Sequence, residues 1–274
     1  MSGLTDRRPL LDGREIPVFG FGCYNSFGEE ITRAVAAAVE TGYRYIDSAA
    51  RYGNEEAVGA ALRQFAGMRE ELFVLSKVWP TSYDAVEESV ETSLKQLGVE
   101  YLDAMLLHWP GTDEARRLRA YEKLLGLQEK GLIRTVGVSN FQWDQVEALR
   151  QQFGSYPAIN ELEIQPAYQQ SELQARCEEK GIVRIAYSPI GRGRYQKDET
   201  VLSIGQKYGK TPSQVVLRWH LQRGTVPIPK SGHPARIREN GNVFDFVLTQ
   251  EEMEQINRLE TGVRSGLDPL TFNG

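Results

Sequence analysis

QLGVEYLDAMLLH, residues 96–108, contains the unit that decides the fold: the end of an amphipathic helix, a glycine, and a short apolar strand that ends in a polar residue. The same unit recurs as ETGYRYID (40–47), EKGLIRTVGVSN (129–140), EKGIVRIAYS (179–188) and QRGTVPIPKS (222–231). Each glycine stands where a helix C-cap needs a left-handed residue. These glycines are Gly42, Gly98, Gly131, Gly181 and Gly224.

Helices precede these glycines. In the segment 82–97 the apolar residues Val86, Val90, Leu94 and Leu97 share one helical face, and Ile31, Val35 and Val39 do the same near the N-terminus. Two further helix starts are marked by capping residues: Thr211 before Pro212, and Thr249 with Glu252 three positions later.

The strands between these helices are short and apolar on both faces, which is typical of a parallel sheet covered on both sides. We expect eight of them, at 18–22, 45–47, 73–77, 104–108, 135–139, 158–163, 183–188 and 225–229. Eight such units predict a closed (β/α)8 barrel, with an extra C-terminal helix after Thr249. PLLDGREIP (9–17) is expected to form a hairpin that turns at Asp12-Gly13 and closes the bottom of the barrel.

The bulk properties agree with an ordinary globular enzyme. The 274 residues suit one barrel of roughly 250 residues, and no linker divides 1–274, so we expect a single domain. A net charge of −5 does not favour nucleic acid, and no apolar run approaches the roughly 20 residues of a membrane span. With two cysteines in no framework and no signal core, we expect a cytoplasmic protein, and we expect a monomer.

Polar residues at the strand ends suggest the chemistry, because barrel active sites lie at that face. Asp47 and Tyr52 follow the second strand, Lys77 ends the third and His108 ends the fourth. A nearby ammonium on Lys77, held by Asp47, is expected to lower the pKa of the Tyr52 hydroxyl so that Tyr52 protonates a carbonyl oxygen oriented by His108. Each residue alone also has a structural interpretation. Asp47 could cap a loop and Tyr52 could be a half-buried ring, while Lys77 could belong to a barrel ion pair and His108 could be a core histidine.

Seven segments resemble the aldo-keto reductase superfamily, in the family's order and from about Val18 to Asn240. They are GYRYIDSAARYGNEEAVG, LSKVWP, LLHWP, GVSNF, INELEIQP, AYSPIGRG and LRWHLQRGTVPIPKS. The resemblance is to NADPH-dependent members with short loops, like those of bacteria and fungi. It implies that the catalytic residues are Asp47, Tyr52, Lys77 and His108, with Tyr52 as general acid in reduction and base in oxidation.

The resemblance also implies an NADPH/NADP+ site. Ser139, Asn140 and Glu161 would bind the carboxamide and Tyr187 would stack on the nicotinamide, while Ser188, Ile190 and Gly191 would follow the pyrophosphate. Lys230, Ser231 and Arg236 would hold the 2′-phosphate, and Glu239 and Asn240 the adenine. Two cations near a hydroxyl favour a phosphomonoester over a bare ribose. Cys23 and Tyr24 would lie near the cofactor, and Tyr24, Trp79 and Trp109 would wall the substrate pocket together with His108.

Two positions depart from the family pattern. Glu161 stands where glutamine is usual, which adds charge beside the nicotinamide and is expected either to raise the pKa of Glu161 or to weaken NADP+ relative to NADPH. Gln165 replaces a common histidine, a position that need not touch the ligand. GRGRY (191–195) is either a mobile basic loop that closes over the pyrophosphate or a plain solvated loop.

Three functions remain open at this point. A reductase of small carbonyl compounds fits the four catalytic residues best. A lyase would form a Schiff base on Lys77, although a lysine beside Asp47 stays charged. A sensor or structural relative would bind NADPH without turnover. The histidines His108, His220 and His233 lack ligand partners at useful spacing, so we expect no metal. The substrate's identity is open among small aldehydes, 2-oxoaldehydes, keto-sugars and β-keto esters.

Overall fold

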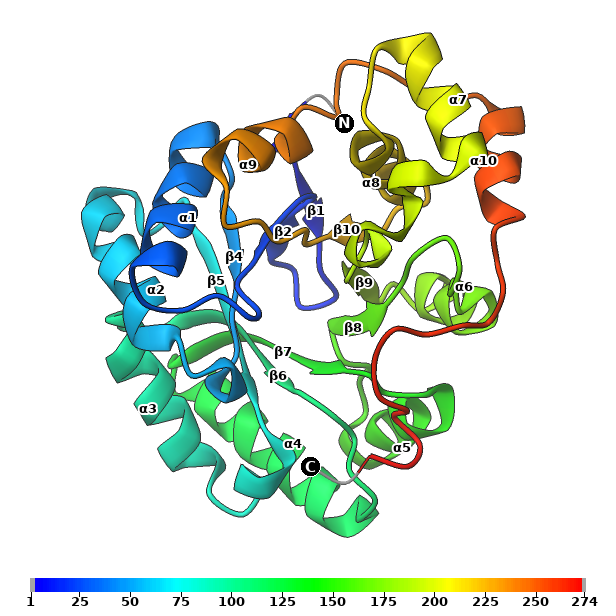
Figure 1. Cartoon of the computed structure of the whole chain (residues 1–274). Coiled ribbons are helices and arrows are strands. Elements are labelled where there is room, and N and C mark those ends of the chain that lie inside the picture. Colours follow the sequence, from blue (N-terminus) through cyan, green and yellow to red (C-terminus); the bar gives the residue numbers. More distant parts are fainter. Residues whose placement is uncertain (1–2, 273–274) are drawn as a thin grey trace.

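The computed structural model describes residues 3–272, so the outermost residues 1–2 and 273–274 of the expected domain lie outside the described chain. Eight parallel strands follow one another in space as they do in sequence (Figure 1). They are β3 (Phe21–Gly22), β4 (Tyr45–Asp47), β5 (Phe73–Val78), β6 (Leu102–Leu107), β7 (Ile133–Ser139), β8 (Ile159–Glu163), β9 (Val183–Tyr187) and β10 (Val226–Pro227). The predicted (β/α)8 architecture is confirmed.

Backbone hydrogen bonds close the sheet on itself at its two edges. The amides of Gly20 and Gly22 donate to the carbonyls of Pro227 and Pro229, at 3.0 and 3.2 Å. A side chain at either glycine would collide with its surroundings: a Cβ on Gly22 would lie 2.8 Å from the carbonyl oxygen of Ile228. Glycine is therefore required where the first and last strands approach each other.

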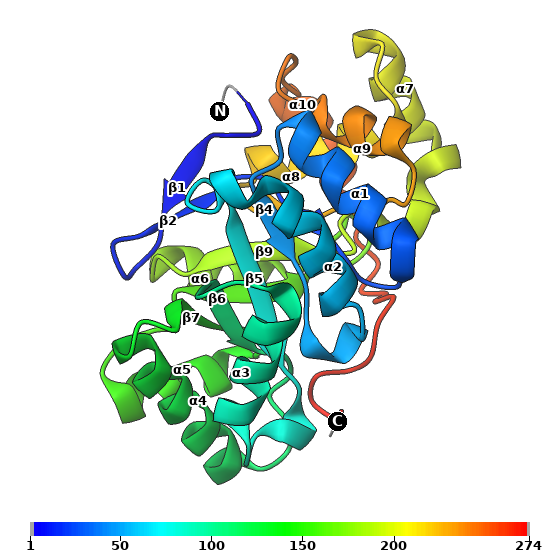
Figure 2. The ribbon, with the colours of Figure 1, turned by 90° about the vertical axis from the view of Figure 1, so that its left-hand side faces the viewer.

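Helices cover the outside of the barrel (Figure 2). They are α1 (Gly28–Thr41), α2 (Glu55–Leu62), α3 (Val86–Leu97), α4 (Glu114–Glu129), α5 (Trp143–Phe153), α6 (Ser171–Glu179), α7 (Glu199–Tyr208), α8 (Pro212–Gln222), α9 (Pro234–Gly241) and α10 (Gln250–Asn257). The five unit glycines all adopt positive φ, as predicted. Capping boxes begin α8 at Thr211 and α10 at Thr249, and α10 is the expected extra C-terminal helix.

One helix begins later than predicted. The expected helix 82–97 is a short 3₁₀ turn, Pro80–Ser82, followed by α3 from Val86. Between them Tyr83 is buried, and its hydroxyl donates to the backbone carbonyl of Trp109. Tyr83 itself keeps helical φ and ψ, and the backbone leaves the helical path at Ala85, with φ −125° and ψ 45°, so α3 begins at Val86.

The N-terminal hairpin consists of β1 (Arg7–Pro9) and β2 (Glu15–Pro17), which pair antiparallel with Gly13 at positive φ in the turn. Its Asp12 carboxylate accepts a hydrogen bond from Thr135 near the start of β7, at 2.7 Å. Leu10 and Ile16 join the apolar cluster inside the barrel, with Tyr45 and Leu75. The hairpin therefore closes the bottom, as expected, and leaves the opposite end of the barrel for the site.

The chain after α10 returns to that opposite end. In Figure 1 this segment is red and runs from α10 across the barrel towards α5. It places Arg264–Phe272 beside the carboxyl ends of the strands, where contacts with Glu163 and Trp109 fix it.

Candidate active site

The four predicted catalytic residues lie at the carboxyl ends of neighbouring strands. Asp47 ends β4, and Tyr52 ends the 3₁₀ turn Ala50–Tyr52 that follows it. Lys77 is the penultimate residue of β5, and His108 directly follows β6. Because β4, β5 and β6 are adjacent parallel strands, their ends meet at one mouth of the barrel.

Lys77 is the centre of this group and is fully buried. Its ammonium lies 2.5 Å from Asp47 Oδ1, donates to the carbonyl of Ser48 at 3.0 Å, and contacts the Tyr52 hydroxyl at 3.5 Å. Burial alone would lower the pKa of Lys77, but the Asp47 carboxylate, with the acid Glu161 beside it, outweighs burial and holds that pKa well above its usual value. Lys77 is therefore a permanent cation next to the Tyr52 hydroxyl.

The net effect on Tyr52 differs from the prediction. Lys77 does lower the pKa of the hydroxyl, but burial raises it more, and the neighbouring acids Asp47 and Glu161 add to the increase. The pKa of Tyr52 is therefore above its usual value of 10.0 rather than below it. Tyr52 keeps its proton at neutral pH, which suits a residue that donates a proton only when negative charge develops on a substrate oxygen.

His108 is held as a neutral imidazole. Burial, then the charges on Lys77 and Arg51, lower its pKa well below 6.5. Its ring edge meets Tyr52 with 5.7 Å between ring centres, and its buried Nδ1 has no hydrogen-bond partner among residues 3–272. The structure thus brings His108 to the same centre as the other three residues, with an unsatisfied nitrogen.

Aromatic side chains surround the catalytic group. Tyr24 lies edge-on to Tyr52 at 5.1 Å, and Trp79 lies edge-on to His108 at 5.0 Å. Phe272 from the C-terminal segment packs against Trp79 and Trp109, with ring centres 5.4 and 4.7 Å apart. These contacts bring the three predicted pocket walls to the mouth and add Phe272 as a further wall.

Glu161 lies at the mouth on β8, two strands beyond β6. Its Oε2 is 3.3 Å from the Lys77 ammonium, and that buried oxygen accepts no hydrogen bond from the described residues. Burial and the neighbouring Asp47 carboxylate raise the pKa of Glu161 well above 4.5, and Lys77 offsets this only in part. The expected upward shift of the Glu161 pKa is confirmed in direction.

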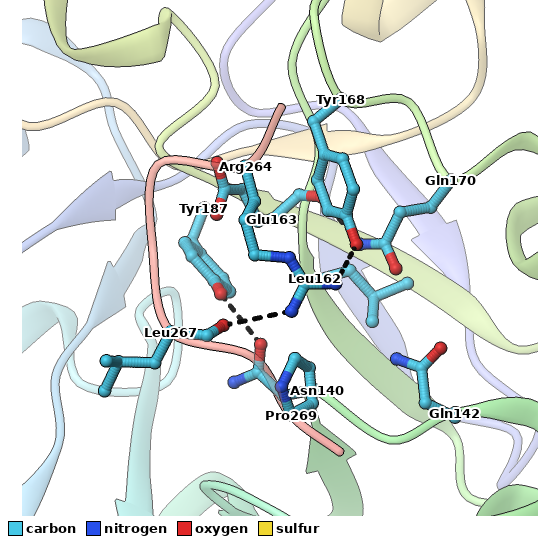
Figure 3. A pocket seen from close by; sticks show the side chains of 10 residues that line it. All are labelled: Asn140, Gln142, Leu162, Glu163, Tyr168, Gln170, Tyr187, Arg264, Leu267 and Pro269. Atoms are coloured by element: carbon cyan, nitrogen blue, oxygen red, sulfur yellow. Dashed lines mark hydrogen bonds between the residues drawn. The ribbon is translucent and has the colours of Figure 1, made fainter. Parts of the chain in front are cut away.

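Asn140 and Tyr187 line a small cavity beside this centre (Figure 3). The Tyr187 hydroxyl donates to Asn140 Oδ1 at 2.8 Å, and Asn140 Nδ2 donates to Ser139 Oγ at 3.1 Å. Leu267 of the C-terminal segment lines the same cavity. Asn140 has a positive φ of 65°, which turns its amide towards the cavity at the end of β7. Ser139, Asn140 and Tyr187 therefore form one connected polar group.

The segment after β9 contains GRGRY and begins beside Ser188 and Ile190. Residues Gly191–Lys197 form short 3₁₀ turns that are interrupted by a kink at Arg192 and Gly193. Tyr195 is buried, donates to Gln165 at 2.7 Å, and accepts from the Ala167 amide at 2.9 Å. Gln165, predicted only as a position that need not touch the ligand, is therefore a structural link that anchors this segment.

The remaining cofactor candidates lie around β10 and α9. Lys230 donates to the carbonyl of Asn25 at 3.1 Å, whereas exposed Arg236 pairs with no carboxylate of residues 3–272. The first turn of α9 has no side-chain cap, so its amides are free for an anion. Ser231, which precedes α9, and Asn240, which lies in it, are both buried. Glu239 accepts a hydrogen bond from the Thr211 hydroxyl at 2.9 Å. Cys23 is buried directly after β3.

Sequence reasoning missed the anchor of the C-terminal segment. The buried Glu163 carboxylate accepts hydrogen bonds from the amide and hydroxyl of Ser265, both at 2.6 Å, and from the Gly266 amide at 3.0 Å. Arg264 adds a hydrogen bond to the Tyr168 hydroxyl at 2.7 Å (Figure 3). The position of Glu163, two residues after Glu161 on the same strand, predicts a side chain at the mouth, but no pattern in 264–272 reveals its partners.

Two further residues at the mouth were also missed. Tyr45 donates from its hydroxyl to Asp47 Oδ2 at 2.6 Å, so Asp47 is held by two partners. The Arg51 guanidinium lies 5.3 Å from the centre of the Trp79 ring and pairs with no carboxylate of the described chain. Arg51 precedes Tyr52 directly, which was the available signal.

The fold and these residues define an oxidoreductase-type barrel, and comparisons with known proteins give the family. The sequence profile of the Aldo/keto reductase family matches residues 20–261. The chain therefore belongs to the aldo-keto reductase family. Within residues 3–272, no helix is long and apolar enough to cross a membrane.

Individual relatives cover almost the whole chain. It is 42% identical over 266 residues to the methylglyoxal reductase DkgA of Yersinia pestis, with 96% of each chain covered. It is 40% identical over 272 residues to an aldo-keto reductase of Mycolicibacterium smegmatis, covering 98% of this chain and 99% of that one. Among solved structures, a mutant of Gox0644 in complex with NADPH superimposes with a TM-score of 0.93 at 34% identity, covering 97% and 98% of the two chains.

Proposed function

We propose that the protein reduces an aldehyde or ketone to an alcohol with NADPH, and that Tyr52 is the general acid. The observation that carries this proposal is the buried contact between the Lys77 ammonium, Asp47 and the Tyr52 hydroxyl. A hydroxyl whose proton is retained at rest, beside a fixed cation that stabilises its anion, is suited to donate that proton when charge develops on a carbonyl oxygen.

The chain's own residues then have distinct roles. Asp47, held by Tyr45, keeps Lys77 charged and in place. Neutral His108 donates a hydrogen bond to the carbonyl oxygen and orients it towards Tyr52. Trp79, Trp109 and Phe272 shield the reacting atoms from water, and Tyr24 packs edge-on against Tyr52. NADPH, when bound, supplies the hydride to the carbonyl carbon.

The residues present fit this cofactor. A buried carboxyl oxygen on Glu161, which has no hydrogen-bond partner among the described residues, and the amide of Asn140 face the place where a carboxamide would bind. We assign the carboxamide to Ser139, Asn140 and Glu161, and the face of the ring to Tyr187, with Cys23 and Tyr24 nearby. Ser188, Ile190 and Gly191 would follow the pyrophosphate. The free Arg236, with Lys230 and Ser231, would hold the 2′-phosphate at the uncapped start of α9, and Glu239 and Asn240 the adenine.

The ion pair of Lys77 argues against the lyase. A Schiff-base lysine must lose its proton to attack a carbonyl, whereas two carboxyl groups keep Lys77 charged. The relatives named methylglyoxal reductase favour small 2-oxoaldehydes and other small aldehydes as substrates.

The test is NADPH oxidation with a panel of aldehydes, 2-oxoaldehydes and keto-sugars, repeated with NADH. We expect turnover with at least one small aldehyde. We also expect Lys230→Ala with Arg236→Ala to raise the Kd of NADPH by about 100-fold and that of NADH by less than about threefold, as lost charge-assisted bonds of roughly 1.5–3 kcal/mol imply. Tight NADPH binding without oxidation by any substrate would instead indicate a sensor.

A further inference from the structure

The centre of the site holds one acid more than its cation can neutralise. Lys77 contacts both Asp47 Oδ1 at 2.5 Å and Glu161 Oε2 at 3.3 Å, and all three side chains are at most 2% exposed. Asp47 has the shorter contact and accepts a second hydrogen bond from Tyr45. Glu161 Oε2 accepts none from the described residues. A buried carboxylate without hydrogen bonds is costly, so Glu161 is the acid that retains a proton.

The surroundings of Glu161 support that protonation state. The titratable groups facing it are Asp47 and Tyr45 on β4, Tyr52 on the following turn, Lys77 on β5 and Tyr187 on β9. Only Lys77 among them is a cation, and Asp47 already pairs with it. Burial and Asp47 raise the pKa of Glu161 accordingly.

We propose that Glu161 stores the proton that carbonyl reduction consumes and delivers it to Tyr52 through Lys77. The path is Glu161 Oε2 to Lys77 Nζ, 3.3 Å, and Lys77 Nζ to the Tyr52 hydroxyl, 3.5 Å. This inference rests on the proposed function, in which Tyr52 is the general acid and Glu161 borders the nicotinamide.

The proton balance of the path is as follows. The Tyr52 O–H bond breaks as its proton joins the substrate oxygen. In one concerted step, a Lys77 N–H bond breaks as the Tyr52 O–H bond re-forms, and the Glu161 O–H bond breaks as a new Lys77 N–H bond forms. Lys77 therefore remains an ammonium throughout. The phenol and the ammonium are unchanged, the alcohol has gained one proton, and Glu161 is left as a carboxylate.

The carboxylate then faces a nicotinamide ring that is cationic when oxidised and neutral when reduced. Opposite charges attract, so ionised Glu161 strengthens NADP+ binding, which reverses the sign of the sequence-based expectation. NADP+ binding should therefore expel the Glu161 proton, and NADPH binding should not. By linkage, the ratio of the two Kd values should change by about tenfold per pH unit while free Glu161 is protonated. The 2′-phosphate is common to both cofactors, so its titration cancels in this ratio.

The experiment is calorimetric titration of the full chain with NADP+ and with NADPH in buffers of different ionisation enthalpy, over a range of pH. We expect the wild type to release about one proton more with NADP+ than with NADPH. Glu161→Gln should bind both cofactors, lose the difference in proton release, and show a pH-independent Kd ratio. Glu55→Gln is the matched control, because Glu55 is a buried acid on α2 that also has a raised pKa but bonds to Ser76 and Ser93 instead.

A single turnover with a pH-indicator dye tests the delivery step. In the wild type, NADPH oxidation should precede proton uptake from solvent, because Glu161 supplies the proton and recovers it only as NADP+ leaves. In Glu161→Gln the two events should coincide. Equal proton release with both cofactors, an unchanged difference in Glu161→Gln, or coincident events in the wild type would each overturn this inference alone. Failure of both cofactors to bind would overturn the proposed function as well.

Discussion

At the scale of single residues, the site is organised by the number of charges around Lys77. One ammonium faces two carboxyl groups, and all three side chains are at most 2% exposed. Removing a proton from Glu161 in this place is costly, while removing the proton of Lys77 would leave Asp47 unpaired. The residues therefore share protons as a unit, and a change at one of them alters the others.

The same charge count affects stability. The pKa of Glu161 in the folded state is raised above the ordinary 4.5. The contribution of Glu161 to the free energy of unfolding is therefore complete below pH 4.5 and is lost as the pH rises towards the folded pKa. In Glu161→Gln the side chain does not ionise, so this loss of stability does not occur. We expect the free energy of unfolding of Glu161→Gln, relative to wild type, to increase by up to about 1.4 kcal/mol per pH unit between about pH 5 and pH 8. Urea unfolding at both pH values measures this, and an equal difference at the two would contradict it.

Arg51 is a cation at the mouth that pairs with no carboxylate of residues 3–272. Its guanidinium lies over the Trp79 ring, and its charge contributes to the lowered pKa of His108. Arg51 is therefore placed to bind a carboxylate group on a carbonyl substrate. We expect Arg51→Gln to lower kcat/KM for a 2-oxo acid by about tenfold or more, which is the effect of losing one charge-assisted hydrogen bond. The kcat/KM for the methyl ester of the same acid should change by less than about twofold, because the ester has no charge to bind.

Arg119→Gln, at an exposed arginine on α4, is the control for that comparison. Equal losses for the acid and its ester in Arg51→Gln would mean that Arg51 acts by packing on Trp79 rather than by charge.

At the scale of elements, close packing between helices depends on single glycines. A Cβ on Gly59 of α2 would lie 2.4 Å from the carbonyl oxygen of Gln96 in α3. We expect Gly59→Ala to lower the free energy of unfolding by about 1–3 kcal/mol, the usual cost of overpacking. Gly126→Ala in α4 has open space and should raise it by about 0.5–1 kcal/mol. Thermal or urea unfolding decides, and two variants of equal stability would refute the packing argument.

The C-terminal segment is tied to the barrel by one side chain. Glu163→Gln replaces the charged acceptor of the Ser265 and Gly266 amides with a neutral one. We expect hydrogen exchange in 264–272 to accelerate by about tenfold or more, because bonds to a charged group contribute about 1.5–3 kcal/mol. Mass spectrometry measures this, with Glu172→Gln on the exposed face of α6 as control. Unchanged exchange would mean that packing of Phe272 alone holds the segment.

Sequence patterns predicted the elements well where the signal is local. The Gly–strand units, the caps at Thr211 and Thr249, and the hairpin at Asp12-Gly13 all lie within a few residues of the structure they specify. The predicted helix start at 82 was wrong because the backbone at Ala85 has non-helical φ and ψ, a break that the apolar spacing of 82–97 does not indicate. The role of 264–272 was not predicted because its partners Glu163 and Trp109 lie more than a hundred residues away in sequence.

At the scale of the whole molecule, barrel closure turns residues distant in sequence into one site. The bonds from Gly20 and Gly22 to the β10 segment complete the ring that brings β4, β5, β6 and β8 to a common mouth. The sequence identified the residues at that mouth, but the net direction of the Tyr52 pKa depends on burial, which no sequence pattern states.

The central claim is that the Tyr52 hydroxyl donates the proton, and Tyr52→Phe tests it most directly. The ring and its contacts with Tyr24 and His108 remain, so NADPH should bind with a Kd within about twofold of wild type, while kcat on a good aldehyde should fall by about 10²–10⁴-fold. Tyr156→Phe, on the outer surface near α5, controls for loss of a hydroxyl. Turnover by Tyr52→Phe near that of wild type would contradict the account.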